Sequence, residues 1–315
     1  MVEINLTSMP IGETRVLLAT GAPVYLFANP VEYHGPHLSL ENDGLVSRGL
    51  ARDLHARLQE THPDWPFLVT ADLGMGCAVV PGPGSRQTSF IHQRKQVLET
   101  CYALAAMGAS RVILMTFHGD PLHLLALQAG VRALAARKIA ALSPMNLLVR
   151  RIVGLQTGDP QMSEVLGAIQ DPQNRRAMAE EMHTDVHAGF GETSLSLHYA
   201  PLSVSPCYRN LPPCPRWQPI PALTAMSRAA RLAGAQTLAD ETAYVAQLLG
   251  WMGLRPFPGY TGRPSLANAE AGARLGRIIV DGMVKACQDV FEFGAAPPEP
   301  VMPWLTTVTL QGRFY

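Results

Sequence analysis

Three side chains that can bind metal ions, Glu32, His34 and Asp43, lie close together in the sequence. They follow the apolar run at residues 24–28, which predicts a buried strand that ends at a turn signal. If the chain stays extended after that turn, Glu32 and His34 point to the same side, because side chains along a strand alternate. A short loop can then bring Asp43 back toward them. Oxygen and nitrogen donors of this kind suit zinc, manganese or a mixed pair, and they disfavour a cysteine-rich structural zinc. The spacing alone also fits ordinary polar loop residues, so the interpretation needs support from elsewhere in the chain.

His118 and Asp120 form a second candidate group. They follow the apolar run at residues 111–117, which predicts another strand. Ligands of open α/β sheets bind at the carboxyl ends of the strands, so both side chains fall where a site is expected. Asp120 also precedes Pro121, and an Asp before a Pro at the first helical position favours a helix cap. Both roles of Asp120 stay open at this point.

A third group lies at residues 183–194 and contains His183, His187 and Glu192. The two histidines are four residues apart and would share one face of a predicted helix at 174–187. A pair of this kind is, by itself, more typical of a solvated helix face than of a metal site.

The elements that must position these groups alternate between apolar runs and helical patterns from about Val16 to His123. This alternation is typical of βαβ units and predicts an α/β fold with a mostly parallel sheet. Strands are predicted at 24–28, 67–71, 111–117 and 146–153, and helices at 43–58, 88–107, 121–137, 174–187, 225–252 and 266–291. We see no internal repeat and no domain boundary, which favours a single domain over residues 1–315. Irregular excursions are expected at about 155–173 and 200–222.

The composition narrows the classes of partner. Lys plus Arg and Asp plus Glu both total 25, and no long basic run is present, so nucleic acid is not an expected partner. Only 16 % of the residues are charged and 47 % are apolar, which indicates more hidden surface than usual. Burial between the subunits of a homo-oligomer is the simplest explanation.

The cysteines and the N-terminal residues indicate the cellular compartment to expect. None of the five cysteines forms a Cys-x-x-Cys pair, and their odd number favours reduced thiols in a cytoplasmic protein. The first residues lack the pattern of a secretory signal, and no apolar run approaches the ~18 residues that span a bilayer. We therefore expect no membrane partner.

Taken together, the three groups resemble the motifs of the creatininase (creatinine amidohydrolase) family. The first motif of that family is Glu-x-His-Gly-Pro-His-Leu-Pro-Leu followed by Asp, and Glu32, His34 and Asp43 occupy the matching positions. The third motif, Asp-x-His-Ala-Gly-x-x-Glu-Thr-Ser, is matched in full by residues 185–194. The Gly/Pro loop at 81–85 and the segment 259–272 are also similar to family segments.

This resemblance implies a layered α/β fold with helices flanking a central, mostly parallel sheet, and an oligomer that is often a hexamer. It also implies two divalent metal ions, zinc or manganese with iron as another choice, at which a bridging water is activated to cleave a C–N bond. By position, the implied ligands are Glu32, His34, Asp43, His118 and Glu192, with Asp43 between the ions. His187 would lie beside a small-molecule substrate, a cyclic or compact amide. An imidazole exchanges protons near neutral pH, so His187 is the candidate that protonates the departing nitrogen.

The second motif departs from the family pattern. Members commonly have Asn-Gly-His-Gly-Gly-Asn, whereas this chain has Thr116, Phe117 and Pro121 in place of the first Asn, the Gly and the last Asn. These changes predict a substrate pocket different from the commonest one in the family. Asp120 falls where creatininase carries an acidic residue beside the metals, so it is a candidate ligand or proton carrier as well as a cap.

Functions other than hydrolysis of an amide also fit these motifs. The same metals could promote lactone hydrolysis or isomerisation of a small metabolite, and a non-catalytic metal-binding member is the third alternative. A Gly-x-Ser-x-Gly elbow is absent from the sequence. The glycine-containing loop at 82–85 is neither a P-loop nor a dinucleotide fingerprint, so no nucleotide cofactor is expected.

Overall fold

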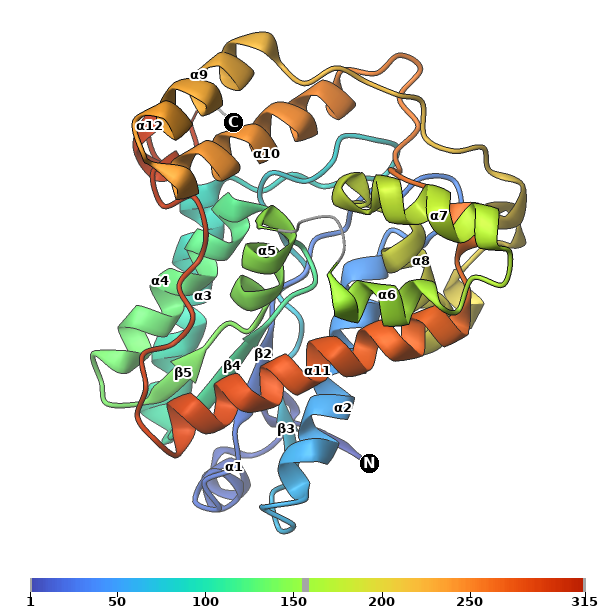
Figure 1. Ribbon diagram of the computed structural model, residues 1–315. Coiled ribbons are helices and arrows are strands. Elements are labelled where there is room, and N and C mark those ends of the chain that lie inside the picture. The colour runs from blue at the N-terminus through green and yellow to red at the C-terminus, as the bar shows by residue number, and fades with distance from the viewer. Residues whose placement is uncertain (1, 155–158, 314–315) are drawn as a thin grey trace.

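The computed structural model describes residues 2–154 and 159–313 (Figure 1). Its centre is a five-stranded sheet in the order β1-β3-β2-β4-β5, in which every neighbouring pair is parallel. The strands are β1 (Glu3–Asn5), β2 (Val24–Phe27), β3 (Phe67–Val69), β4 (Arg111–Met115) and β5 (Ala140–Leu142). The predicted α/β class with a parallel sheet is therefore confirmed.

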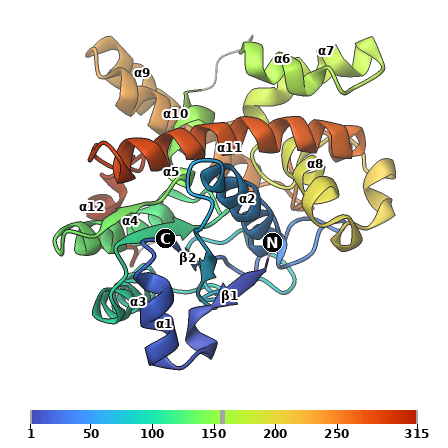
Figure 2. The ribbon, with the colours of Figure 1, turned by 90° about the horizontal axis from the view of Figure 1, so that it is seen from below.

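Helices cover both faces of this sheet, as Figure 2 shows. Right-handed crossovers place α1 (Ile11–Leu18), α3 (Phe90–Met107) and α4 (Pro121–Ala135) on one face. On the other face lie α2 (Asn42–Gln59) and the long α11 (Ala269–Phe291). The result is a layered helix–sheet–helix arrangement, again as expected.

The position of β2 explains where a site can form. All four of its side chains are fully buried, because a central parallel strand is covered on both faces. The chain leaves β2 through α2 toward β3 on one side, and it leaves β4 through α4 toward β5 on the other. The carboxyl ends of β2 and β4 thus flank a topological switch point, where open α/β sheets bind ligands.

The remaining elements lie mostly beyond this carboxyl edge (Figure 1). The α-helices are α5 (Met145–Val153), α6 (Pro160–Leu166), α7 (Pro172–Glu181), α8 (Phe190–Tyr199), α9 (Pro221–Leu232), α10 (Gln236–Met252) and α12 (Leu305–Val308). The 3-10 turns are η1 (Leu6–Ser8), η2 (Met182–Thr184), η3 (Pro201–Ser203), η4 (Pro206–Asn210) and η5 (Pro264–Leu266). None of the described helices is long and apolar enough to cross a membrane.

The strand predicted at 146–153 is wrong, because that segment is the helix α5. Its buried residues, Met145, Asn146 and Val149, are spaced for one helix face, while Arg150 is exposed. The strand of this region is the shorter β5, just before it. β1 and α1 were not predicted.

Several boundaries also differ from the prediction. The single helix predicted at 225–252 is two helices, α9 and α10, since Gly234 between them has a left-handed φ of 79°. The helix predicted at 174–187 ends at Glu181, so His183 and His187 do not share a helix face. Of the excursion predicted at 155–173, residues 155–158 lie outside the described residues, and the rest contains α6, whose first turn is capped by Asp159. The excursion at 200–222 is mainly coil with the turns η3 and η4.

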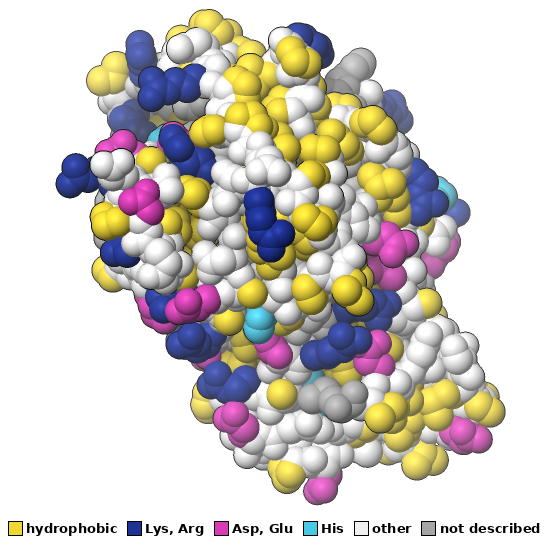
Figure 3. Space-filling model, turned by 90° about the vertical axis from the view of Figure 1, so that its right-hand side faces the viewer, with side chains coloured by type: hydrophobic (Ala, Val, Ile, Leu, Met, Phe, Trp, Pro, Cys, Tyr) yellow, Lys and Arg dark blue, Asp and Glu magenta, His cyan; other side chains and the backbone are white. Residues whose placement is uncertain are grey.

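One face of the surface, the right-hand side of Figure 1, is shown in Figure 3. Hydrophobic side chains gather in its upper half, and charged side chains of both signs are scattered over much of the face.

The packing of α4 on α3 can be tested at Gly130. A methyl group there would lie 2.7 Å from Val97 Cγ1 and 2.8 Å from Cys101 Sγ, whereas one at the exposed helical Gly282 would meet nothing within 4 Å. We expect Gly130→Ala to lower the free energy of unfolding by about 1–3 kcal/mol through overpacking. Gly282→Ala, the control, should raise it by up to about 1 kcal/mol because Ala favours a helix. Urea denaturation measures both, and equal effects would contradict the packing described.

Candidate metal centre

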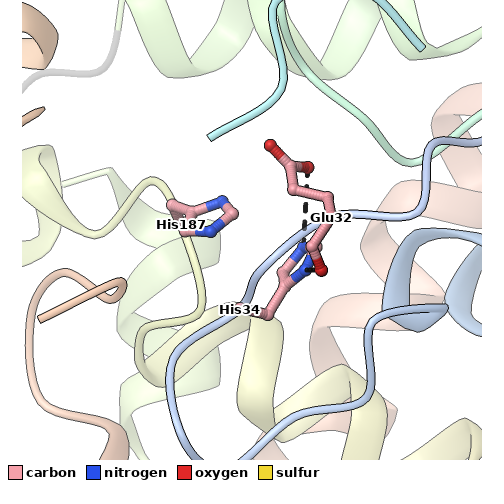
Figure 4. Close-up of side chains that lie close together, drawn as sticks. All are labelled: Glu32, His34 and His187. Carbon is pink, nitrogen blue, oxygen red and sulfur yellow. Dashed lines mark hydrogen bonds and ion pairs between the residues drawn. The ribbon is translucent and has the colours of Figure 1, made fainter. Parts of the chain in front are cut away.

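His34 follows β2 and points one ring nitrogen at a group of carboxylates. Its Nδ1 lies 3.0 Å from the carbonyl oxygen of Glu32. A carbonyl only accepts, so Nδ1 is the nitrogen that carries the proton in the neutral ring, and Nε2 carries the lone pair. Nε2 lies 3.3 Å from Glu192 Oε1 and 3.4 Å from Asp43 Oδ1. Figure 4 shows the side chains of Glu32, His34 and His187 close together, with dashed lines that join Glu32 and His34.

His118, which follows β4, repeats this arrangement. Its Nε2 donates to the carbonyl oxygen of Cys77 at 3.2 Å, so in the neutral ring Nδ1 carries the lone pair. Nδ1 lies 3.0 Å from Glu32 Oε2 and 3.8 Å from Asp43 Oδ2. A backbone carbonyl that fixes the far nitrogen of a histidine is the usual outer contact of a metal ligand.

The five predicted ligand positions form two groups that share Asp43. One group is Glu32, Asp43 and His118, the other is His34, Asp43 and Glu192, and within each group the ligand atoms lie within 4.8 Å of one another. A third group within the same distance joins Glu32 and His34 to His187. Four of the five residues are fully buried and Glu192 is largely so. Two groups joined by one carboxylate could hold two cations. The structure brings the five side chains together, and their role as ligands stays a prediction.

Unsatisfied buried atoms test whether a cation fits. Glu32 Oε2, His34 Nε2 and Asp43 Oδ2 are buried and have no hydrogen-bond partner among the described residues. Burying such atoms without a partner is costly, especially for charged groups. A tetrahedral ion with bonds of about 2.1 Å has ligand–ligand distances of about 3.4 Å, which the distances around His34 match. The residues therefore fit a divalent cation.

The charged groups of the cluster also fit a bound cation. Burial raises the pKa of Asp43 to about 6, since the ionised form loses its hydration. Burial lowers the pKa of His118, but the neighbouring Glu32 and Asp43 outweigh it and raise that pKa to about 10. Without a metal, the cluster would thus hold protons in place of cations. Asp43 and Glu192 also lie in the first turns of α2 and α8, whose helix dipoles favour negative charge.

Hydrogen bonds from loops hold the carboxylates in place. Glu32 accepts from the N–H of Val80, and Ser85 ties this loop by donating to Val80 O at 2.7 Å. Asn42 donates to Glu192 Oε1 at 3.0 Å and accepts from Ser196 at 2.6 Å. Sequence reasoning missed Asn42, although its place directly before Asp43 was an available signal.

His187 lies at the edge of the cluster. Its Nε2 donates to Tyr33 O at 2.9 Å, and its ring stacks on His34 at 4.4 Å between centroids. Burial, followed by the charge of His34, lowers the pKa of His187, so its neutral form predominates near pH 7. In this tautomer Nδ1 is the nitrogen that can accept a proton. Thr261, which was also missed, accepts from the N–H groups of Val186 and His187 at 2.9 and 3.0 Å.

Asp120 caps α4, one of the roles expected for it. Its Oδ1 accepts from Leu122 N at 2.8 Å and from His123 N at 3.2 Å. It belongs to neither ligand group that shares Asp43. A role in ligation or proton transfer stays a prediction.

In the divergent second motif, hydrogen bonds from other residues hold the loop in place of the missing Asn side chains. Thr116 Oγ1 accepts from His118 N at 3.2 Å and contacts His123 Nε2 at 3.1 Å. The amide N–H of Phe117 donates to Asn29 Oδ1 at 3.0 Å. The loop is thereby ordered, and the Phe117 side chain is free to line a cavity.

Two cavities meet at the cluster. An inner one of about 140 Å³ and an outer one of about 780 Å³ are both lined by Glu32, His118 and His187. Tyr244 of α10 lines both as well. No local motif marked Tyr244, because only the tertiary fold brings α10 over the end of β4.

The chain is similar to known proteins in sequence and in fold. The sequence model of the creatininase family, described as creatinine amidohydrolase, matches residues 10–287. A crystal structure of creatinine amidohydrolase (creatininase) is 19% identical, with 92% of this chain and 98% of that chain covered and a TM-score of 0.58. A structure named "Creatininase Mn" is 19% identical, with 92% and 100% covered and a TM-score of 0.56. A mutant creatininase of "Zn-Zn type" is 18% identical, with 92% and 99% covered and a TM-score of 0.58. No curated protein matches the chain.

The hydrogen bonds from the N–H groups of Val186 and His187 to the Thr261 hydroxyl can be tested by substitution. Thr261→Val removes the hydroxyl that accepts from two buried N–H groups, and leaving such donors unpaired costs about 1–3 kcal/mol. We therefore expect the free energy of unfolding to fall by about 1–3 kcal/mol. Amide hydrogen exchange at Val186 and His187 should become faster. Thr261→Ser keeps the hydroxyl and should retain most of the protection. Equal exchange rates in the two variants would contradict the role of the Thr261 hydroxyl as acceptor for these two N–H groups.

Proposed function

The chain belongs to the creatininase family, and we propose that it is a metal-dependent hydrolase that cleaves the C–N bond of a small amide, cyclic or compact. The observation that carries the proposal is the sharing of Asp43 between two groups of buried ligand atoms. Family membership supports an amidohydrolase, and the cluster supplies the donors that such a reaction needs.

The proposed ligand sets follow the two groups. Glu32 and His118 would hold one ion, His34 and Glu192 the other, and Asp43 would contact both. The donor set suits zinc, manganese or iron, and the names of two similar structures mention manganese and zinc. When bound, two divalent cations lower the pKa of a water between them and polarise a carbonyl group.

Side chains around the cluster would carry out the proton transfers of the reaction. In amide hydrolysis a water oxygen bonds to the carbonyl carbon, the C–N bond breaks, and the nitrogen gains a proton. His187 is proposed to carry that proton on Nδ1, since its Nε2 is engaged by Tyr33 O at 2.9 Å. Its lowered pKa keeps the ring neutral, so Nδ1 is free to take the proton that the attacking water loses, and it makes the protonated ring a readier donor of that proton to the departing nitrogen. Asp120 is the second candidate for proton transfer, because it lines the outer cavity.

We also propose a cytoplasmic homo-oligomer, with a hexamer as the expected form. Large hydrophobic side chains are exposed at Leu202, Leu232 and Phe293. Hydrophobic side chains gather on part of the face in Figure 3, as expected of a subunit surface. The five free cysteines suit a reducing compartment.

Asp43→Asn tests the shared ligand. The amide keeps the shape of the side chain but removes the charge that would join the two ions, so both should be lost. We expect manganese affinity to fall by about a hundredfold or more, with elemental analysis showing little metal after gel filtration. Hydrolysis of any amide that the wild type cleaves should fall in parallel.

Glu41→Gln is the matched control for this variant. Glu41 also lies at the start of α2, but its side chain is exposed and outside both ligand groups. Its metal content should equal that of the wild type. Retention of two metal equivalents by Asp43→Asn would refute the ligand assignment.

A further inference from the structure

The inner cavity has one polar end and mostly apolar walls. Leu148, Val149 and Ile152 of α5 line one side, and Leu275, Ile278 and Ile279 of α11 line another. Glu32, Asp43, His118 and Glu192 form the polar end. A ligand that fills this space must therefore have two chemically different ends.

The other charged residues of the wall are already engaged. Arg151 pairs with Asp159, with 2.6 Å between its Nη2 and the carboxylate. Asp185 accepts from the N–H groups of Phe190 and Gly191 at 2.8 and 2.7 Å. Both oxygens of Asp185 are thus satisfied within the protein, and Arg151 already has a counter-charge. The buried polar atoms of the cavity wall that lack a partner in the described part of the chain, Glu32 Oε2 and Asp43 Oδ2, lie at the cluster.

The volume limits the size of the apolar end. The inner cavity measures about 140 Å³. An apolar cavity of about 150 Å³ engineered in another protein stays dry and holds one benzene molecule. A single ring or a chain of about five carbons is thus sufficient to fill it.

From this shape we propose that the substrate carries a compact apolar group beside its scissile C–N bond. The apolar group lies between α5 and α11, and the bond lies at the Glu32–Asp43–His118 end. A small, fully polar amide would leave these walls without a partner, so the apolar group supplies binding energy and selectivity. The inference rests on the proposed metal-dependent hydrolase and names the class of its substrate.

Alkyl hydroxamates test the proposal, because their common head group binds divalent metals while the tail varies. The probes are acetohydroxamate, butyrohydroxamate, hexanohydroxamate and decanohydroxamate, titrated calorimetrically into the manganese-loaded wild-type protein. Affinity should rise about fourfold per added methylene up to hexanohydroxamate and then level off when the cavity is full. Excess EDTA should abolish binding if the head lies at the metals.

Two Leu→Trp variants locate the tail. Leu148 lines the inner cavity, whereas Leu248 of α10 lines the outer cavity and not the inner one, and both are partly exposed. Leu148→Trp should weaken hexanohydroxamate at least tenfold and change acetohydroxamate less than threefold. Leu248→Trp, the control, should change both by less than threefold. Circular dichroism and metal content verify that both variants are folded and loaded.

The possible outcomes distinguish failure of this inference from failure of the proposed metal-dependent hydrolysis. Equal affinities of acetohydroxamate and hexanohydroxamate for the wild type would overturn the apolar subsite and leave the metal site standing. Equal effects of the two Trp variants on hexanohydroxamate would do the same. If the wild-type protein takes up no manganese, the proposed function fails, and the inference fails with it.

Discussion

The burial of three carboxylates around two imidazole lone pairs is the constraint on which the rest of the structure depends. Glu32, Asp43 and Glu192 lie within a few ångströms of His34 and His118, away from water. Like charges packed this closely need counter-charge, which cations or protons must supply. Two helix N-termini, at α2 and α8, contribute part of it. The unsatisfied oxygen and nitrogen atoms at the centre are where the proposed cations would supply the remainder.

The fold is arranged to keep these side chains in place. The parallel sheet brings the ends of β2 and β4 together, and backbone carbonyls then fix which nitrogen of each histidine is free. The loop before α8 brings His187 to the same point and is itself held by Thr261. These contacts reach the cluster from segments far apart in the chain, so the geometry belongs to the whole domain. The inner cavity beside the cluster then adds apolar walls from α5 and α11, which is where this chain can select its substrate.

The sequence predicted the parts whose signals are local. The apolar run of β2, the strand end at His118 and the matched third motif were sufficient to locate the cluster, and the α/β class followed from alternating patterns. The errors have a common cause, since short apolar segments such as 146–153 fit a strand or a buried helix until packing decides. Asn42, Thr261 and Tyr244 were missed because each acts through a contact made only in the folded chain. The cap at Asp120 was among the alternatives, and its local Asp-Pro signal explains why.

The central claim is that Asp43 joins two cations. Anomalous diffraction from crystals of the manganese-loaded protein, measured at the manganese edge, tests it most directly. The account predicts two peaks about 3.5 Å apart with one oxygen of Asp43 directed at each or one oxygen shared. Glu32 and His118 should contact one peak, and His34 and Glu192 the other. A single peak, or two peaks that Asp43 does not contact, would contradict it.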